Sequence, residues 1–203
     1  MSDASEQADA RPLIVGMGGS TGAHSSTNQL LQQALAHVAA RGARTQAFAG
    51  DVLGRVPIYS TELVETQSHE EVTREFVDAV RAADCVIIAT PGYHGGMSGL
   101  VKNALDHLEA LRDDARPYLD GRAVGVIVGA AGWQACGTAL VSVRSAVHSL
   151  RGWPTPFGVT VNTVEQKPGA DGTFDDVVDG ALQILADQLV QFARWQSASA
   201  TAR

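Results

Sequence analysis

Short runs of β-branched and other apolar residues alternate along this chain with segments of helical periodicity, and this alternation constrains the fold more than any other feature. Strands are expected at residues 13–17, 44–49, 85–89, 123–128 and 157–161. Most of these runs are apolar at successive positions, which is typical of strands buried on both faces. The alternation therefore predicts an α/β protein: a five-stranded parallel sheet with helices on both sides.

Between these runs, apolar residues recur at intervals of three and four, which predicts amphipathic helices. Leu30 and Val38 belong to one such stripe, which ends at Gly42, and Val72 and Phe76 belong to a second that starts near residue 68. Three more helices are expected at 100–111, 138–150 and 175–195. With 203 residues, the chain predicts one domain over 12–196, a disordered N-terminal tail over 1–11 and a frayed C-terminal tail over 197–203.

Charge and hydropathy exclude several classes of function. The chain has 15 Lys and Arg against 22 Asp and Glu, a formal net charge of -7, and no basic stripe. Nucleic acids and anionic membrane surfaces are therefore not expected as partners. The longest nearly apolar stretch, 123–133, is shorter than the roughly 18 residues of a membrane helix. Residues 1–10 lack the basic and apolar regions of a signal peptide, so a cytoplasmic protein is expected.

The cysteines and histidines predict no metal site. Cys85 and Cys136 are too few for a disulfide framework or a cysteine-rich zinc site, and both are expected as small buried hydrophobic residues. The six histidines show no metal-ligand spacing.

Two loops stand out where a doubly wound sheet places its ligand. In the common strand order 2-1-3-4-5, ligands bind beyond the carboxyl ends of strands one and three. The loops at that point, 18–27 and 90–99, are also the loops of the chain richest in glycine and hydroxyl side chains. Topology and composition thus predict the same site.

The first of these loops opens directly into a helix, and its hydroxyls and amides suit a phosphate at the positive end of that helix. The simpler alternative is that Ser25 or Thr27 only caps the helix while the glycines turn the chain. A P-loop is excluded because no lysine precedes Lys102. The dinucleotide fingerprint fails at Thr21, although Asp51 after the second strand keeps that alternative open.

The same loop satisfies the Gly-x-Ser-x-Gly nucleophile elbow, with Ser20 as the nucleophile. Asp120 and His148 complete the chain order Ser, Asp, His of a serine hydrolase. The elbow lies after the first strand, however, whereas the hydrolase fold reaches its elbow only after several strands. A serine hydrolase is therefore the less favoured alternative function.

Three segments resemble a known family. Residues 19–27 resemble the phosphate loop of the NADPH-dependent FMN reductase family, 91–96 together with 99–106 resemble its Pro-x-Tyr-Asn-Gly-Ser and Gly-x-x-Lys-Asn-Ala segment, and 51–59 are similar to its stretch after the second strand. The resemblance implies a flavodoxin-like three-layer sandwich that holds FMN. The family's loop arginine is Gly22 here, which implies looser binding of FMN or its exchange as a substrate.

Carried over residue by residue, the resemblance implies phosphate contacts at Ser20, Ser25, Ser26 and Thr27. It implies contacts to the isoalloxazine ring at Pro91, Gly92, Tyr93, His94, Gly95 and Gly96, and a third ring-side loop at 129–134 that includes Gly129 and Gly132. No side chain is expected to act as an acid or base, because the flavin carries the chemistry.

The resemblance implies an oxidoreductase that takes electrons from NADPH or NADH through FMN. The acceptor stays open among free FMN for a partner monooxygenase, a quinone, an azo compound or similar. A flavodoxin-type electron carrier is the alternative. A homodimer or homotetramer is expected, with the helix of Lys102 and Asp106 in a dimer contact, although those two side chains also have the spacing of a simple ion pair.

Overall fold

The computed structural model describes residues 9–22, 24–63, 66–67 and 69–201. The tail predicted at 1–11 lies outside these residues except for positions 9–11, and so do the last two residues of the tail predicted at 197–203. The strands are β1 (Leu13–Gly18), β2 (Arg44–Phe48), β3 (Cys85–Pro91), β4 (Ala123–Ala130), β5 (Trp153–Pro154) and β6 (Val159–Asn162). The helices are α1 (Ser26–Ala40), α2 (Asp51–Gly54), α4 (Glu71–Ala82), α5 (Gly99–Asp106), the 3-10 helix η1 (His107–Leu111), α6 (Trp133–Ser149) and α7 (Asp176–Thr201).

The strands form one parallel sheet in the order β2-β1-β3-β4-β5, which confirms the predicted order, and β6 also pairs with β4. The fifth position of the sheet is thus shared by two short strands. β5 pairs with the start of β4 at Ala123, and β6 pairs with its end, from Ile127 to Ala130. The strand predicted at 157–161 corresponds to β6, and the sequence pattern misses β5 because two residues are too few to show a period.

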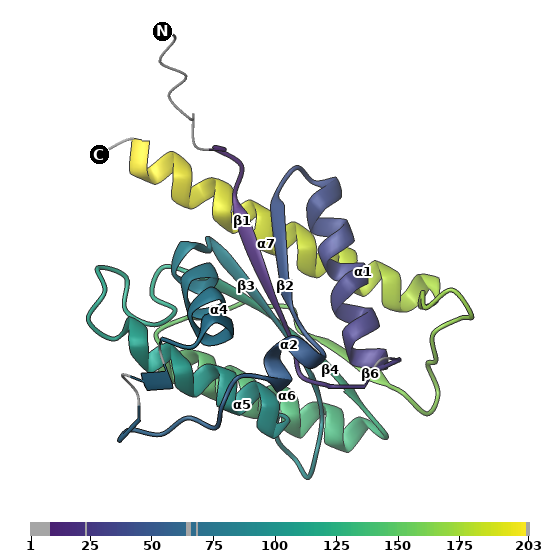
Figure 1. The fold of residues 1–203 in the computed structure, drawn as a ribbon. Coiled ribbons are helices and arrows are strands. Elements are labelled where there is room, and N and C mark those ends of the chain that lie inside the picture. Colours follow the sequence, from purple (N-terminus) through teal and green to yellow (C-terminus); the bar gives the residue numbers. More distant parts are fainter. Residues whose placement is uncertain (1–8, 23, 64–65, 68, 202–203) are drawn as a thin grey trace, which may run out of the picture.

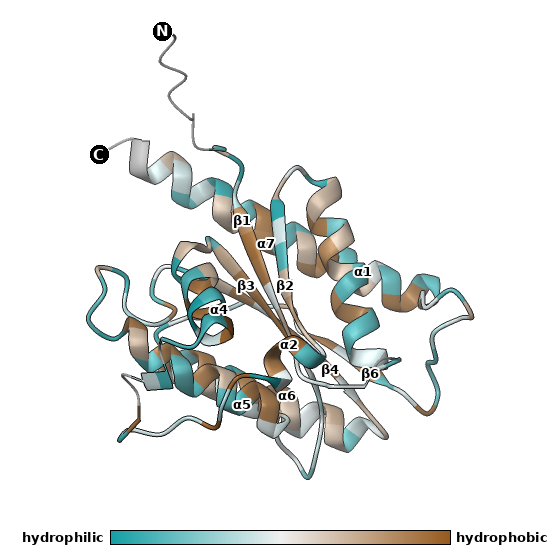
Figure 2. Ribbon diagram, viewed as in Figure 1, coloured by the Kyte–Doolittle hydropathy of each residue, from teal (hydrophilic) through white to brown (hydrophobic). Residues whose placement is uncertain are grey.

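Helices cover both faces of the sheet: α1 and α7 lie on one side, and α4, α5 and α6 lie on the other (Figure 1). Side chains alternate along each central strand between the two cores; on β1, Val15 and Met17 face the second group of helices while Ile14 faces α1 and α7. The central strands β1, β3 and β4 are fully buried, and Figure 2 shows brown, apolar residues on β1 and β3 and teal residues on the outer sides of the helices.

Two glycines let the helices of one layer approach the sheet closely. A Cβ at Gly16 would lie 2.9 Å from Leu31 and Leu35 of α1. A Cβ at Gly125 would lie 3.1 Å from Leu185 and Leu189 of α7. Both contacts are tighter than a real side chain tolerates without movement, so these glycines fix the spacing of the layer that holds α1.

The last helix is longer than expected, because α7 continues to Thr201, past the start of the predicted tail at 197. Helix α6 begins at Trp133, before the predicted residue 138. Both cysteines are free and buried, and burial raises the pKa of the Cys85 thiol to about 12. Among the residues described, no helix has the length and apolar character needed to cross a bilayer.

Candidate functional site

A cavity of about 630 Å³ lies beyond the carboxyl ends of β1, β3 and β4, at the reversal of strand order where the sequence predicts the site. Its volume is within the range of small-molecule pockets. Its walls come from the loops that follow β1, β3, β4 and β6. The lining residues are Ser20, Gly22, His24, Ser25, Ser26, Thr27, Pro91, Gly92, Tyr93, Gly129, Ala130, Ala131 and Thr163.

The loop after β1 is held close to its neighbours by backbone bonds and by glycines without side chains. The amide of Gly19 donates to the carbonyl of Ala89 at the end of β3, at 2.7 Å. A Cβ on Gly19 would lie 2.7 Å from Val101 of α5, so only glycine fits here. The side-chain amide of Asn28 donates to the carbonyl of Ser20 at 2.8 Å and ties the loop back to α1.

Ser25 begins α1 as its N-cap, and its hydroxyl accepts from the amide of Asn28 at 3.4 Å. The Ser25 amide donates to the carbonyl of Gly22 at 3.1 Å, which closes a turn just before the helix. The remaining first-turn amides of a helix point out of its end. Capping and anion binding are therefore compatible at this loop, because Ser20, Ser26 and Thr27 add further hydroxyls around the same helix end.

A tight turn follows β3. The amide of Tyr93 donates to the carbonyl of Gly96 at 3.0 Å, and the amide of Gly96 donates back to the carbonyl of Tyr93 at 2.9 Å. The two residues between them have positive φ, 51° at His94 and 83° at Gly95, which is the geometry of a type I′ turn. Pro91, Gly92 and Tyr93 line the cavity, whereas His94, Gly95 and Gly96 do not, so the turn stands beside the wall.

This turn is supported from two sides. The buried hydroxyl of Thr90 accepts from the amide of Ser98, whose own hydroxyl caps α5. The amide of Gly92 donates to the carbonyl of Gly129 at 2.9 Å, which joins the loops after β3 and β4. Tyr93 itself is 57% exposed, so its ring is available as a surface at the cavity mouth.

The loop after β4 completes the cavity. A Cβ on Gly129 would lie 3.3 Å from the Thr27 hydroxyl, so a glycine keeps this wall flat. Gly132 has a φ of 120° and does not line the cavity, but its amide donates to the side chain of buried Asn162 at 3.1 Å. Asn162, at the end of β6, therefore orients this loop.

Sequence reasoning missed Asn162 and the lining residue Thr163. It placed the other lining residues within its predicted loops, without naming a contact for each: Gly22 and His24 in 18–27, and Ala130 and Ala131 in 129–134. Thr163 follows a predicted strand, so the rule that ligands lie beyond the carboxyl ends of parallel strands could have found it. The residues of the cavity that the structure describes include no Lys, Arg, Asp or Glu, and His24 and Tyr93 are their only titratable side chains. In the part of the chain that the structure describes, groups of His, Cys, Asp and Glu with metal-site geometry do not occur.

The elbow hypothesis fails on topology. Ser20 follows β1 at the carboxyl edge of the sheet, whereas Asp120 precedes β4 and His148 lies in the last turn of α6, both at the amino edge. β4 has 8 residues, so the two edges are roughly 25 Å apart at about 3.3 Å per residue. Ser20, Asp120 and His148 therefore do not form a catalytic triad.

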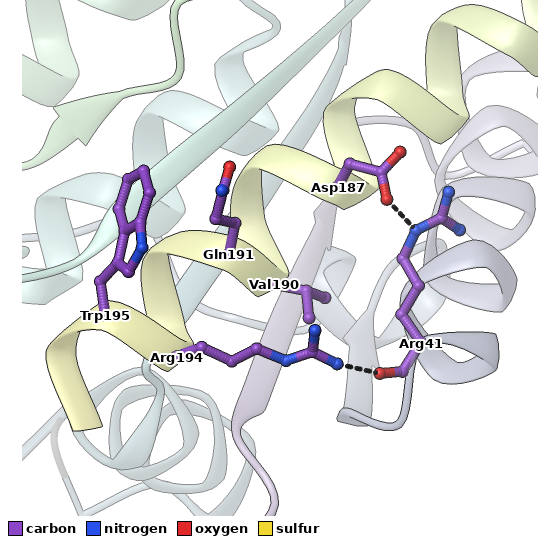
Figure 3. A pocket seen from close by; sticks show the side chains of 6 residues that line it. All are labelled: Arg41, Asp187, Val190, Gln191, Arg194 and Trp195. Atoms are coloured by element: carbon purple, nitrogen blue, oxygen red, sulfur yellow. Dashed lines mark hydrogen bonds and ion pairs between the residues drawn. The ribbon is translucent and has the colours of Figure 1, made fainter. Parts of the chain in front are cut away.

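A second cavity, of about 450 Å³, lies between the end of α1 and α7 (Figure 3). There the Arg41 guanidinium pairs with Asp187 at 2.5 Å, and Arg194 donates to the carbonyl of Arg41 at 3.0 Å. This pair raises the pKa of Arg41 and lowers that of Asp187. These charges are used in joining the two helices, so the cavity at the carboxyl edge is the better candidate site.

Comparison with known proteins identifies the family. Residues 12–166 match the family model described as NADPH-dependent FMN reductase, which confirms the predicted resemblance. An FMN-dependent NADPH-azoreductase of Staphylococcus haemolyticus is 33% identical over 122 residues, 59% of this chain and 61% of the relative. One of Staphylococcus aureus is 32% identical over 133 residues, 63% of this chain and 67% of the relative. The first match thus spans less than two thirds of the relative's length.

Solved structures confirm the predicted flavodoxin-like fold. A flavoenzyme NAD(P)H:(acceptor) oxidoreductase from Paracoccus denitrificans superposes with a TM-score of 0.73 at 21% identity, covering 90% of this chain and 97% of the other. An NADH:FMN oxidoreductase gives 0.67 at 25% identity and 89% of each chain. A flavodoxin, WrbA-like protein from Agrobacterium tumefaciens gives 0.61 at 14% identity, covering 92% of this chain and 99% of the other.

Proposed function

Because the chain belongs to the NADPH-dependent FMN reductase family, we propose that it is an NAD(P)H-dependent oxidoreductase that binds FMN in the cavity at the carboxyl edge of the sheet. One observation carries the assignment to this cavity: a hydroxyl-rich helix N-terminus and a flat, glycine-lined wall face the same space. The first suits a phosphate and the second suits a planar ring.

The residues present fit FMN. Ser20, Ser25, Ser26 and Thr27 surround the start of α1 and would hold the phosphate through hydroxyls and amides. At the other end, the backbone of 91–96 would lie along the ring edge, where the paired bonds between Tyr93 and Gly96 keep the turn in one shape. Gly129 keeps the opposite wall free of a side chain.

The chain's own part in the reaction is to bind and orient. FMN, when bound, supplies two-electron chemistry between a nicotinamide and an acceptor. The lining residues that the structure describes carry no carboxylate, so the walls do not repel the phosphate or a reduced, negatively charged ring. Tyr93 lines the cavity and is exposed, so its ring would be available to an entering nicotinamide or acceptor.

The acceptor we propose to test first is an aromatic azo compound, because the two relatives described above are named azoreductases. A quinone and free FMN for a partner monooxygenase are the next candidates. A flavodoxin-type electron carrier would bind FMN without oxidising NADPH, so turnover of NADPH separates the two functions. A homo-oligomer and a cytoplasmic location belong to the same proposal; exposed Trp133, Trp153 and Trp195 supply large apolar surface for subunit contacts.

The experiment is a titration of the purified chain with FMN, followed by anaerobic mixing with NADPH. We expect quenching of flavin fluorescence on binding and bleaching of the flavin absorbance on addition of NADPH, then recovery when an azo dye is added. Ser25→Ala should raise the dissociation constant of FMN about tenfold, since a charge-assisted hydrogen bond is lost. Ser145→Ala, on the exposed face of α6, is the matched control. Absence of any flavin spectral change would refute the proposal.

A further inference from the structure

His24 is the one described lining residue of the cavity whose side chain can carry a positive charge. It directly precedes the N-cap Ser25, inside the turn that the bond from the Ser25 amide to the Gly22 carbonyl closes. Its side chain is exposed at the cavity rim, so it is free to reorient toward a ligand. The other groups around this helix end are hydroxyls and backbone amides, which are neutral.

We propose that His24 is a specificity-determining residue that pairs with the phosphate of FMN and so favours the binding of FMN over riboflavin. The inference rests on the proposed FMN site. A phosphate monoester carries a charge of about -1.5 to -2 at neutral pH. The described wall holds no Lys or Arg, so the His24 imidazole is the strongest side-chain partner available to this phosphate.

The surrounding charges do not replace His24. The turn after β3 contributes Tyr93, and the loop after β6 contributes the neutral Thr163 to the cavity. α2 packs against the loop after β1, since a Cβ on Gly54 would lie 3.2 Å from Thr21. Asp51 begins this helix and Arg55 is its C-cap. Neither Asp51 nor Arg55 lines the cavity.

The test measures the dissociation constants of FMN and riboflavin by flavin fluorescence at neutral pH and constant ionic strength. In the wild type, we expect FMN to bind more tightly than riboflavin. His24→Ala should lower this preference about five- to tenfold, because a partner of the phosphate is lost. His24→Arg should restore the preference. His148→Ala, in the last turn of α6, is the matched control and should behave as wild type.

The outcomes separate the two proposals. If FMN and riboflavin both fail to bind, the proposed function fails and takes this inference with it. If FMN binds and His24→Ala keeps the wild-type preference for FMN over riboflavin, the role of His24 is refuted while the proposed function stands. Circular dichroism of each variant ensures that only folded protein is compared.

Discussion

Replacing Gly95 by valine tests whether the turn at Tyr93–Gly96 shapes the wall of the site. Gly95 has a φ of 83°, in the left-handed region that an L-residue adopts at a cost of about 1–2 kcal/mol, and a β-branched residue at a higher cost. The nearest heavy atom to a Cβ there is the Thr138 hydroxyl at 3.8 Å, an ordinary contact. The penalty that the structure shows for Gly95→Val is therefore backbone strain.

The strain at Gly95 should lower the Tm by a predictable amount and should act on the turn at Tyr93–Gly96. A chain of about 200 residues loses about 2–4 °C in Tm per kcal/mol, so Gly95→Val should lower the Tm by about 2–8 °C and leave the protein folded. We expect the turn to relax its strain by giving up the bonds between Tyr93 and Gly96, which moves the ring-side wall. The affinity for FMN should therefore fall at least fivefold.

The assay pairs thermal unfolding with a flavin titration, and Gly95→Asn is the matched control, since asparagine tolerates positive φ better than other residues. Gly95→Asn should keep wild-type affinity and most of the Tm. If Gly95→Val binds FMN as the wild type does, the turn does not shape the site. Equal loss of affinity in both variants would show that the side chain itself, and not the backbone conformation, disturbs binding.

Three further outcomes are expected. Ser20→Ala should weaken FMN binding with no esterase activity to lose; labelling of Ser20 by a fluorophosphonate would contradict this. Arg122 is 1% exposed and donates to carbonyl oxygens at the end of α4 and in the segment before β4. Arg122→Met should therefore lower the free energy of unfolding, measured in urea, by about 3 kcal/mol. A loss below about 0.5 kcal/mol would show that these bonds are dispensable. A hydrogen bond from Gln33, and a further one from His37, lower the pKa of Asp179 below 3.8, so its stabilising effect is complete above about pH 4 and is lost as the pH falls through the folded-state value. The free energy of unfolding, measured in urea from pH 7 to 3, should therefore decline less steeply with falling pH in Asp179→Asn than in the wild type. An unchanged slope would argue against this role.

The sheet could be predicted from the sequence because its central strands are buried on both faces. Val15, Ile87 and Val126 belong to runs in which nearly every residue is apolar, and such runs need no knowledge of their neighbours to be recognised. The order of the strands followed from the most common topology of this class. The division of the fifth strand could not be predicted, because it depends on tertiary contacts of Thr155 and Gly158 with β4 and α6.

The cavity was partly predictable for a similar reason. Glycines and hydroxyls at the ends of two strands mark Ser20 and Gly92 from composition alone. Ala131 carries no chemical signal, and it lines the cavity only because the loop after β4 bends at Gly132. Asn162 is a long-range anchor whose partner lies 30 residues earlier, and residue spacing along the chain does not report such a bond.

The divided fifth strand also affects how separate molecules behave toward one another. An open sheet edge can pair with the edge of another molecule and start aggregation. Here such a molecule would first meet β5, of 2 residues, where Pro154 offers no N–H. Next, the Arg144 guanidinium already donates to the carbonyls of Thr155 and Pro156, at 2.9 Å each. Only the 4 residues of β6 remain for pairing, too short a template for an intermolecular sheet to grow from this side.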